Sequence, residues 1–261
     1  MPPMYTDQPL SLIPTLKFQT GNAVGQDDAF TIEASHMALS NNALIRGFNS
    51  IYQQAPHLSL DADKSDFVGY CISWAECVLT HYEYETCNLF LGIEKAARER
   101  GLMNSHSSLE GHLFYVELDS IRRYLLYIRF RGFGFSSTEL LRLMDRFKKM
   151  FHEHLKSKPL ALAAIVEYST PGNPIDIHRI VETAERKQLE EVDWKYKFNT
   201  LPVFFLNMET ATFEDGMWHE ASPPMKGSLR GVPLRLVSMW KLRRWRFASC
   251  AHNGRLKPLA V

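Results

Sequence analysis

The chain has 261 residues, with 30 lysines and arginines against 29 aspartates and glutamates, so its formal net charge is only +1. A near-neutral chain has no overall field that would select nucleic acid or an anionic membrane as its partner. Because 45% of the residues are hydrophobic and no apolar run reaches membrane-spanning length, the composition is that of an ordinary globular protein and excludes a disordered or membrane-spanning chain.

The first residues of the chain show no basic segment followed by a continuous apolar stretch, so we expect no secretory signal and a cytoplasmic protein. The four cysteines are widely spaced and include no C-x-x-C pair, which favours reduced thiols that pack inside the fold. Residues 1–26 contain several prolines and little periodicity, and they are expected to form an extended arm lying on the fold.

Apolar residues then recur at helical spacing over four segments, with Asp27 or Asp28 as the first N-cap. The predicted helices cover residues 27–55, 66–100, 107–131 and 136–159. Prolines and glycines end these segments, and no strand pattern lies between them. Long helices joined by short loops predict an all-α fold, an antiparallel up-down four-helix bundle over residues 27–168.

Residues 169–261 are expected to form an irregular C-terminal extension that wraps the bundle, with a short helix from Pro174 to about Glu191 and room for one hairpin. This extension contains WKLRRWRF at 240–247, in which Lys241 and three arginines alternate with aromatic rings. Such a pattern can bind nucleic acid through phosphate contacts and base stacking. Because the chain has no wider basic field, we instead expect the rings to pack on the bundle, with no nucleic-acid and no membrane partner.

Polar side chains interrupt the apolar stripe of each predicted helix. Spacings of three or four residues keep side chains on one face, and they place the following polar groups inward: Asn41, His81, Glu85, His112, His154 and Lys158. A single buried histidine is usually a hydrogen-bonded core residue. Three histidines with a glutamate from facing helices are also the residue types with which helix bundles bind iron or manganese. Both interpretations remain open on spacing alone.

Several segments are similar to one known family. They are SNNALIRGFNSIYQQAP at 40–56, DFVGYCISWAECVLTHYEYETCNLFLGIE at 66–94, EGHLFYVELDSI at 110–121 and FHEHLKSKPLAL at 151–162. With them the chain resembles the hemerythrin-like (HHE cation-binding) family, and its fungal branch in particular. LPVFFLNMETATFEDG at 201–216 and WRFASCAHNGRLKPL at 245–259 are similar to the C-terminal extension of that branch, so the resemblance covers nearly the whole chain.

The resemblance implies a carboxylate-bridged di-iron centre, which binds dioxygen in the best-known members. Position by position, it implies that four metal ligands survive: His81, Glu85, His112 and His154. Three family ligands are replaced. Asn41 stands where the first helix has a histidine, Val116 where the third helix has its second histidine, and Lys158 where the fourth helix has its bridging carboxylate.

The ammonium of Lys158 would repel two metal cations beside it, so two irons are not expected. His36 is no replacement for Asn41, because five residues place it about 140° away around a helix. One hypothesis is a single iron, manganese or zinc ion on the four surviving ligands. The other is a metal-free polar core in which Lys158 pairs with Glu85.

A further alternative follows from fungal members that are encoded beside secondary-metabolite genes. Such a protein would be an enzyme or pathway accessory with a small organic ligand in a bundle cavity, which we expect Tyr82, Tyr115 and the histidines to line. A metal-free structural or interaction protein is the third class. The sequence names no catalytic residue, and it leaves metal or dioxygen binding, ligand binding and a structural role as open alternatives.

Overall fold

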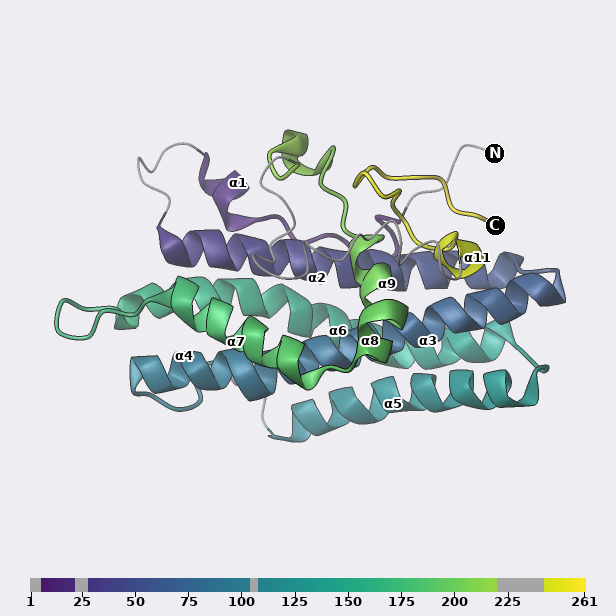
Figure 1. The fold of residues 1–261 in the computed structure, drawn as a ribbon, viewed down its shortest axis with the longest axis horizontal. Helices are drawn as coiled ribbons and strands as arrows, with labels where there is room; N and C mark the ends of the chain where they lie inside the picture. The colour runs from purple at the N-terminus through teal and green to yellow at the C-terminus, as the bar shows by residue number, and fades with distance from the viewer. Residues whose placement is uncertain (1–5, 22–27, 104–107, 220–241) are drawn as a thin grey trace.

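The computed structural model describes residues 6–21, 28–103, 108–219 and 242–261, and this part of the chain is predominantly helical (Figure 1). Within these ranges there is no strand, only two isolated bridges, Thr170 with Asn173 and Cys250 with Leu256. The expected all-α class is therefore confirmed. None of the helices in these ranges combines the length and apolar character that crossing a membrane requires.

Four long helical segments lie side by side and form the body of the molecule, and successive segments run in opposite directions (Figure 1). They are α2 (Ala29–Gln54), the continuous run of α3 (Asp61–Glu83), the π-helical turn η3 (Tyr84–Leu89) and α4 (Phe90–Ala97), then α5 (Ser108–Arg131) and α6 (Ser137–Ala164). Helix α2 packs along α6, α3 along α5, and α5 along α6.

Local capping signals set the beginnings of these helices. The carboxylate of Asp28 accepts from two backbone amides in the first turn of α2, and Ser136 accepts from an amide in the first turn of α6. Both caps agree with the sequence prediction. Helix α3 begins at Asp61 rather than near Asp66, because Asp61 and Asp63 place negative charge at the positive end of the helix dipole.

Shorter elements surround the four long segments. They are α1 (Leu16–Thr20), η2 (Ala55–His57), η4 (Ile165–Tyr168), α7 (Ile177–Glu191), α8 (Trp194–Asn199), α9 (Leu201–Phe205), η5 (Phe213–Gly216) and α11 (Leu242–Trp245). Helix α7 confirms the helix predicted after Pro174. The hairpin considered for the extension is not found in the described residues, because short helices such as α9 pack their apolar residues directly on α2 and α3.

Polar side chains on the outer face of α2 hold the arm and the C-terminal extension. Both the amide and the carbonyl of Ile13 pair with the side chain of Asn42, each at 2.8 Å. Asn49 binds the arm in the same way. The amide of Gln54 donates to the carbonyl of Phe247 at 3.0 Å. Helix α2 is consequently buried on almost every face, although it carries many polar residues.

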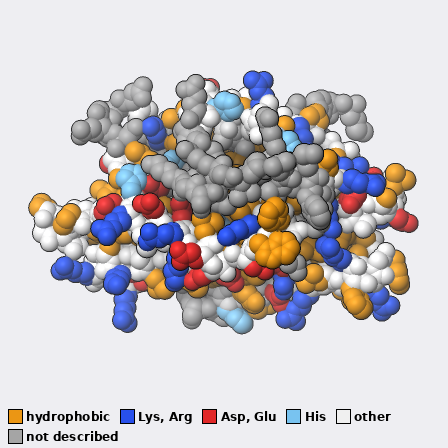
Figure 2. All heavy atoms as spheres, in the orientation of Figure 1, with side chains coloured by type: hydrophobic (Ala, Val, Ile, Leu, Met, Phe, Trp, Pro, Cys, Tyr) orange, Lys and Arg blue, Asp and Glu red, His pale blue; other side chains and the backbone are white. Residues whose placement is uncertain are grey.

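The basic and aromatic segment of the extension packs as expected. Trp245 and Phe247 are buried against the long helices, while Arg243 and Arg246 form ion pairs with aspartates of α3. Residues 240–241 lie outside the described part of the chain. Figure 2 shows basic and acidic side chains interspersed over the visible surface of α7 and α4, as the near-zero net charge predicts.

All four cysteines are free, as predicted, but the expected packing inside the fold is wrong for Cys87, whose side chain is exposed. Cys71, Cys77 and Cys250 are buried, and burial raises the pKa of each thiol above its ordinary value. These three side chains therefore act as small apolar packing residues.

Two apolar cores lie along the length of the molecule. The larger one joins α2, α3, α5 and α6 with the C-terminal segments, and the smaller one joins the first half of α2 with α4, the end of α6 and α7. Between them, three long segments each place a buried polar side chain: Asn41 on α2, Glu85 on η3 and Lys158 on α6. The candidate site is this polar layer between the two cores.

Candidate functional site

The first, second and fourth long segments turn the predicted stripes inward. Asn41, Glu85, His154 and Lys158 are all buried, with Glu85 at 0% and Lys158 at 1% exposure. His81 is partly buried beside them, with 14% of its side chain exposed. Sequence periodicity therefore located these five side chains correctly, and the structure brings His81, Glu85 and His154 into contact.

The third segment turns a different face inward. His112, Tyr115 and Val116 are exposed, so the inward orientation predicted for His112 and Val116 is wrong. The buried stripe of α5 consists of Phe114, Leu118, Ile121, Leu125 and Ile128. This stripe is continuously apolar, whereas the predicted one contained polar residues, and the hydrophobic effect selects the apolar face. The structure does not bring His112 to the other three predicted ligands.

Glu85 lies between two imidazoles from different segments. Its Oε2 accepts from Nε2 of His154 at 2.9 Å, and its Oε1 lies 3.2 Å from Nε2 of His81. Burial alone would raise the pKa of this carboxyl, but the charge of His81 and the hydrogen bond from His154 outweigh it and hold the pKa well below the ordinary value. Glu85 is therefore a buried carboxylate kept ionised by its imidazole neighbours.

The backbone is widened where Glu85 sits. In η3 the amide of Phe90 bonds to the carbonyl of Glu85, five residues back, instead of four as in an α-helix. Single π-helical turns of this kind occur often at functional sites, because they shift the side chains that follow them. The sequence pattern does not predict this turn, because the spacing of three or four residues continues from Val78 through His81 and Glu85 to Leu89.

Asn41 meets α6 where Pro159 interrupts the backbone ladder. Proline has no N–H, so the carbonyl of Leu155, four residues earlier, loses its helical partner. Nδ2 of Asn41 donates to that carbonyl at 2.8 Å, and Oδ1 accepts from Nε2 of His81 at 3.0 Å. Because a carbonyl only accepts, this contact also fixes the orientation of the amide and assigns a proton to Nε2 of His81. Helix α6 can therefore continue through Pro159 instead of ending there as predicted.

Lys158 fills the end of the polar layer with a buried cation. Its Nζ donates to the carbonyl of Met103 at 2.7 Å and lies 5.0 Å from the centre of the Phe90 ring. Both contacts favour a positive charge at this position. The pairing of Lys158 with Glu85 stays a prediction.

Aromatic rings cover His154 from the side of α5. Tyr82 stacks on Phe114 with ring centres 4.6 Å apart, and Phe114 lies 5.0 Å from the ring of His154. A Cβ atom at Gly111 would lie only 2.7 Å from the hydroxyl of Tyr82, so this glycine makes room for the ring. Helix α5 thus contributes the ring of Phe114 to the site, and α3 contributes the ring of Tyr82. Neither Tyr82, which packs on Phe114, nor the exposed Tyr115 is among the residues that line the cavity described below.

These contacts test whether the residues suit a metal centre. Among the described residues, no group of three or more His, Cys, Asp or Glu side chains is arranged to hold a metal ion. Nε2 of His81 directs its proton to Asn41, whereas a metal needs the lone pair of a ligand nitrogen. With Lys158 in place of a bridging carboxylate and Phe114 facing His154, the residues present do not fit a di-iron centre.

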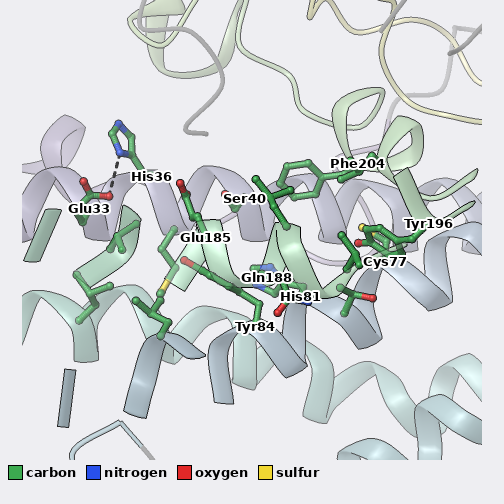
Figure 3. A pocket seen from close by; sticks show the side chains of 18 residues that line it. Glu33, His36, Ser40, Cys77, His81, Tyr84, Glu185, Gln188, Tyr196 and Phe204 are labelled. Atoms are coloured by element: carbon green, nitrogen blue, oxygen red, sulfur yellow. Dashed lines mark hydrogen bonds and ion pairs between the residues drawn. The ribbon is translucent and has the colours of Figure 1, made fainter. Parts of the chain in front are cut away.

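A cavity of about 120 Å³ lies beside the polar cluster, between α2, α3, α7, α8 and α9 (Figure 3). His81 belongs to both, because it lines the cavity and contacts Glu85. Most of the wall is apolar and includes Met37, Leu162, Val181, Leu189 and Phe204. Sequence reasoning missed this cavity, although the apolar spacing of Ile177, Val181 and Ala184 on α7 indicates a face that must pack on another element.

Ionisable groups surround one end of the cavity. The carboxylate of Glu33 contacts Nδ1 of His36 at 3.4 Å and Nδ1 of His178. Burial would raise the pKa of Glu33, but these two hydrogen bonds bring it below the ordinary value. Burial and the nearby charges of Glu185, Glu85 and Glu33 raise the pKa of Tyr84 well above its ordinary value. At neutral pH the cavity therefore faces an ionised carboxylate and a neutral phenol.

Comparison with known proteins yields no match to a family model, to a curated protein or to a solved structure. The function must therefore be argued from the site itself.

Proposed function

We propose that this chain is a hemerythrin-like four-helix up-down bundle that has replaced its di-iron centre with a hydrogen-bonded polar cluster, and that it binds a small organic molecule in the adjacent cavity. The alternating direction of the long segments and the residue types at His81, Glu85 and His154 support the first part. The cavity whose wall includes His81 is the observation that carries the second part.

Ligand sites in proteins are concave and mostly apolar, with a few fixed polar groups that orient the ligand. The cavity has this composition, since apolar residues dominate its wall. His81 is held by Asn41 and Glu85, and both partners are buried. An imidazole held from two sides loses little further freedom when a ligand binds, which favours affinity.

A cavity-filling variant tests this proposal. A molecule that binds only the folded state raises the melting temperature, so a panel of small ring compounds is screened by thermal shift. Val181→Phe places a ring in the cavity and should abolish the shifts, whereas Thr183→Phe on the exposed face of α7 should retain them. Shifts of equal size in both variants, or no shift with the wild type, would contradict the proposal.

A single metal ion on His81, Glu85 and His154 is a second candidate. One observation favours it: Oε1 of Glu85 is buried and lies 3.2 Å from Nε2 of His81, whose hydrogen bond goes to Asn41, so this oxygen accepts no hydrogen bond of its own. Metal content measured by mass spectrometry, on protein expressed with iron and purified without chelator, decides between the candidates. One ion per chain that is lost in His154→Ala would establish the metal, and an absence of metal would reject it. Two ions would contradict the charge argument from Lys158.

A further inference from the structure

The charged side chains in the cavity wall, apart from its histidines, are all acidic. Glu33 enters from α2 and Glu185 from α7, and the described lining residues include no lysine and no arginine. Figure 3 shows both glutamates at the same end of the cavity, where α2 contacts α7. Acidic side chains gathered at one end of a cavity attract a cation to that end.

The pKa of Tyr84 reflects the negative charge near the cavity wall. The phenol of this residue lines the cavity, and its pKa is raised first by burial and then by the charges of the carboxylates of Glu185, Glu85 and Glu33. Three carboxylates from three different segments therefore act on the same wall. An anionic ligand would be repelled there, and a cation would be attracted.

The aromatic rings in the wall and the size of the cavity further limit which ligands fit. Tyr84, Tyr196 and Phe204 line the cavity, and the faces of such rings attract cations. Its volume of about 120 Å³ is somewhat below the roughly 150 Å³ of an engineered apolar cavity that binds benzene. The space suits one ring or a short branched chain rather than a fused ring system.

We infer that the cavity binds a small organic cation, an amine carried on an apolar body about the size of one ring, with its ammonium directed to Glu33 and Glu185. This inference rests on the proposed function, because it assumes that the cavity is a ligand site. It adds the charge and size of the ligand, neither of which the family resemblance implies.

Three probes of similar size and shape test the effect of ligand charge: benzylamine is a cation, benzyl alcohol is neutral and benzoate is an anion. Binding of each probe is measured by calorimetry and thermal shift at the same neutral pH, so that only the probe differs between the measurements. We expect benzylamine to bind on the order of tenfold more tightly than benzyl alcohol, as one charge-assisted contact would provide, and benzoate not to bind.

Variants assign the selectivity to the named carboxylates. Glu185→Gln should reduce benzylamine affinity to that of benzyl alcohol, and Glu190→Gln, an exposed acid on the same helix, should have no effect. Equal binding of benzylamine and benzyl alcohol would overturn the cation inference while leaving a ligand cavity. If neither these probes nor the panel of small ring compounds binds the wild type, the proposed function itself fails. The probe comparison needs no variant, so misfolding of Glu185→Gln does not prevent a decision.

Discussion

The side-chain amide of Asn41 replaces the backbone amide that Pro159 lacks. It donates to the Leu155 carbonyl at 2.8 Å, the hydrogen bond that a residue other than proline would make at position 159. The same side chain accepts from His81, so the asparagine links the long segments α2, α3 and α6. The contribution of Asn41 to stability should therefore depend on the proline at position 159 of the facing helix.

This coupling can be measured. We expect Asn41→Ala to lower the free energy of unfolding by about 1–3 kcal/mol, because it leaves the buried Leu155 carbonyl without a partner. In a Pro159→Ala background, position 159 regains a backbone amide, and the same substitution should cost clearly less. Urea unfolding of the wild type, the two single variants and the double variant gives the coupling. Equal costs of Asn41→Ala in both backgrounds would contradict the assigned hydrogen bond.

The acid stability of the protein should depend on Glu85. Its pKa in the folded state is lowered from the ordinary value of 4.5, so ionised Glu85 stabilises the fold. That contribution is present above the ordinary carboxyl pKa and is lost as the pH falls below it toward the lower folded value. Urea midpoints between about pH 6 and pH 3 should therefore fall less steeply in Glu85→Gln than in the wild type.

Glu190→Gln supplies the control for this measurement, since Glu190 is an exposed acid far from the polar layer in sequence. Its acid profile should follow that of the wild type. Parallel profiles for Glu85→Gln and the wild type would mean that His81 and His154 do not hold the carboxylate in its ionised form.

The sequence predicted most of the fold because its signals are local. Caps such as Asp28 and Ser136, and the stripes ending in Glu85 and Lys158, depend on residues within one or two turns. The buried face of α5 was predicted wrongly because the prediction was based on its polar residues. Phe114 and the apolar residues that follow it at helical spacing form the buried face.

The remaining features depend on residues far apart in the chain. Helix α6 continues through Pro159 because Asn41, more than a hundred residues earlier, donates the hydrogen bond that the backbone of Pro159 cannot. The cavity exists because α7, α8 and α9 close over α2 and α3, and each short helix alone has too few residues to show where it packs. The spacing of residues within one helix does not show which distant segment the helix will contact.

A glycine on α2 makes room for the indole of Trp74 on α3. A Cβ atom at Gly47 would lie 2.5 Å from Cδ1 and 2.8 Å from Nε1 of Trp74, whose indole is buried and donates to the Leu44 carbonyl. Gly47→Ala gains about 1 kcal/mol of helix propensity but overpacks the core at a cost of about 1–3 kcal/mol. We expect a net loss of stability in urea unfolding. Gly172→Ala, where nothing lies within 4 Å, should be near neutral, and equal stabilities would contradict the close contact.

The buried ammonium of Lys158 should be needed for its charge as well as its length. Lys158→Met keeps the length and leaves the Met103 carbonyl unpaired, which costs about 1–3 kcal/mol. Lys158→Glu should cost more, because it directs a buried carboxylate at a carbonyl oxygen and at the negative face of the Phe90 ring. Urea unfolding at neutral pH ranks the two variants. A Lys158→Glu protein at least as stable as Lys158→Met would contradict these contacts.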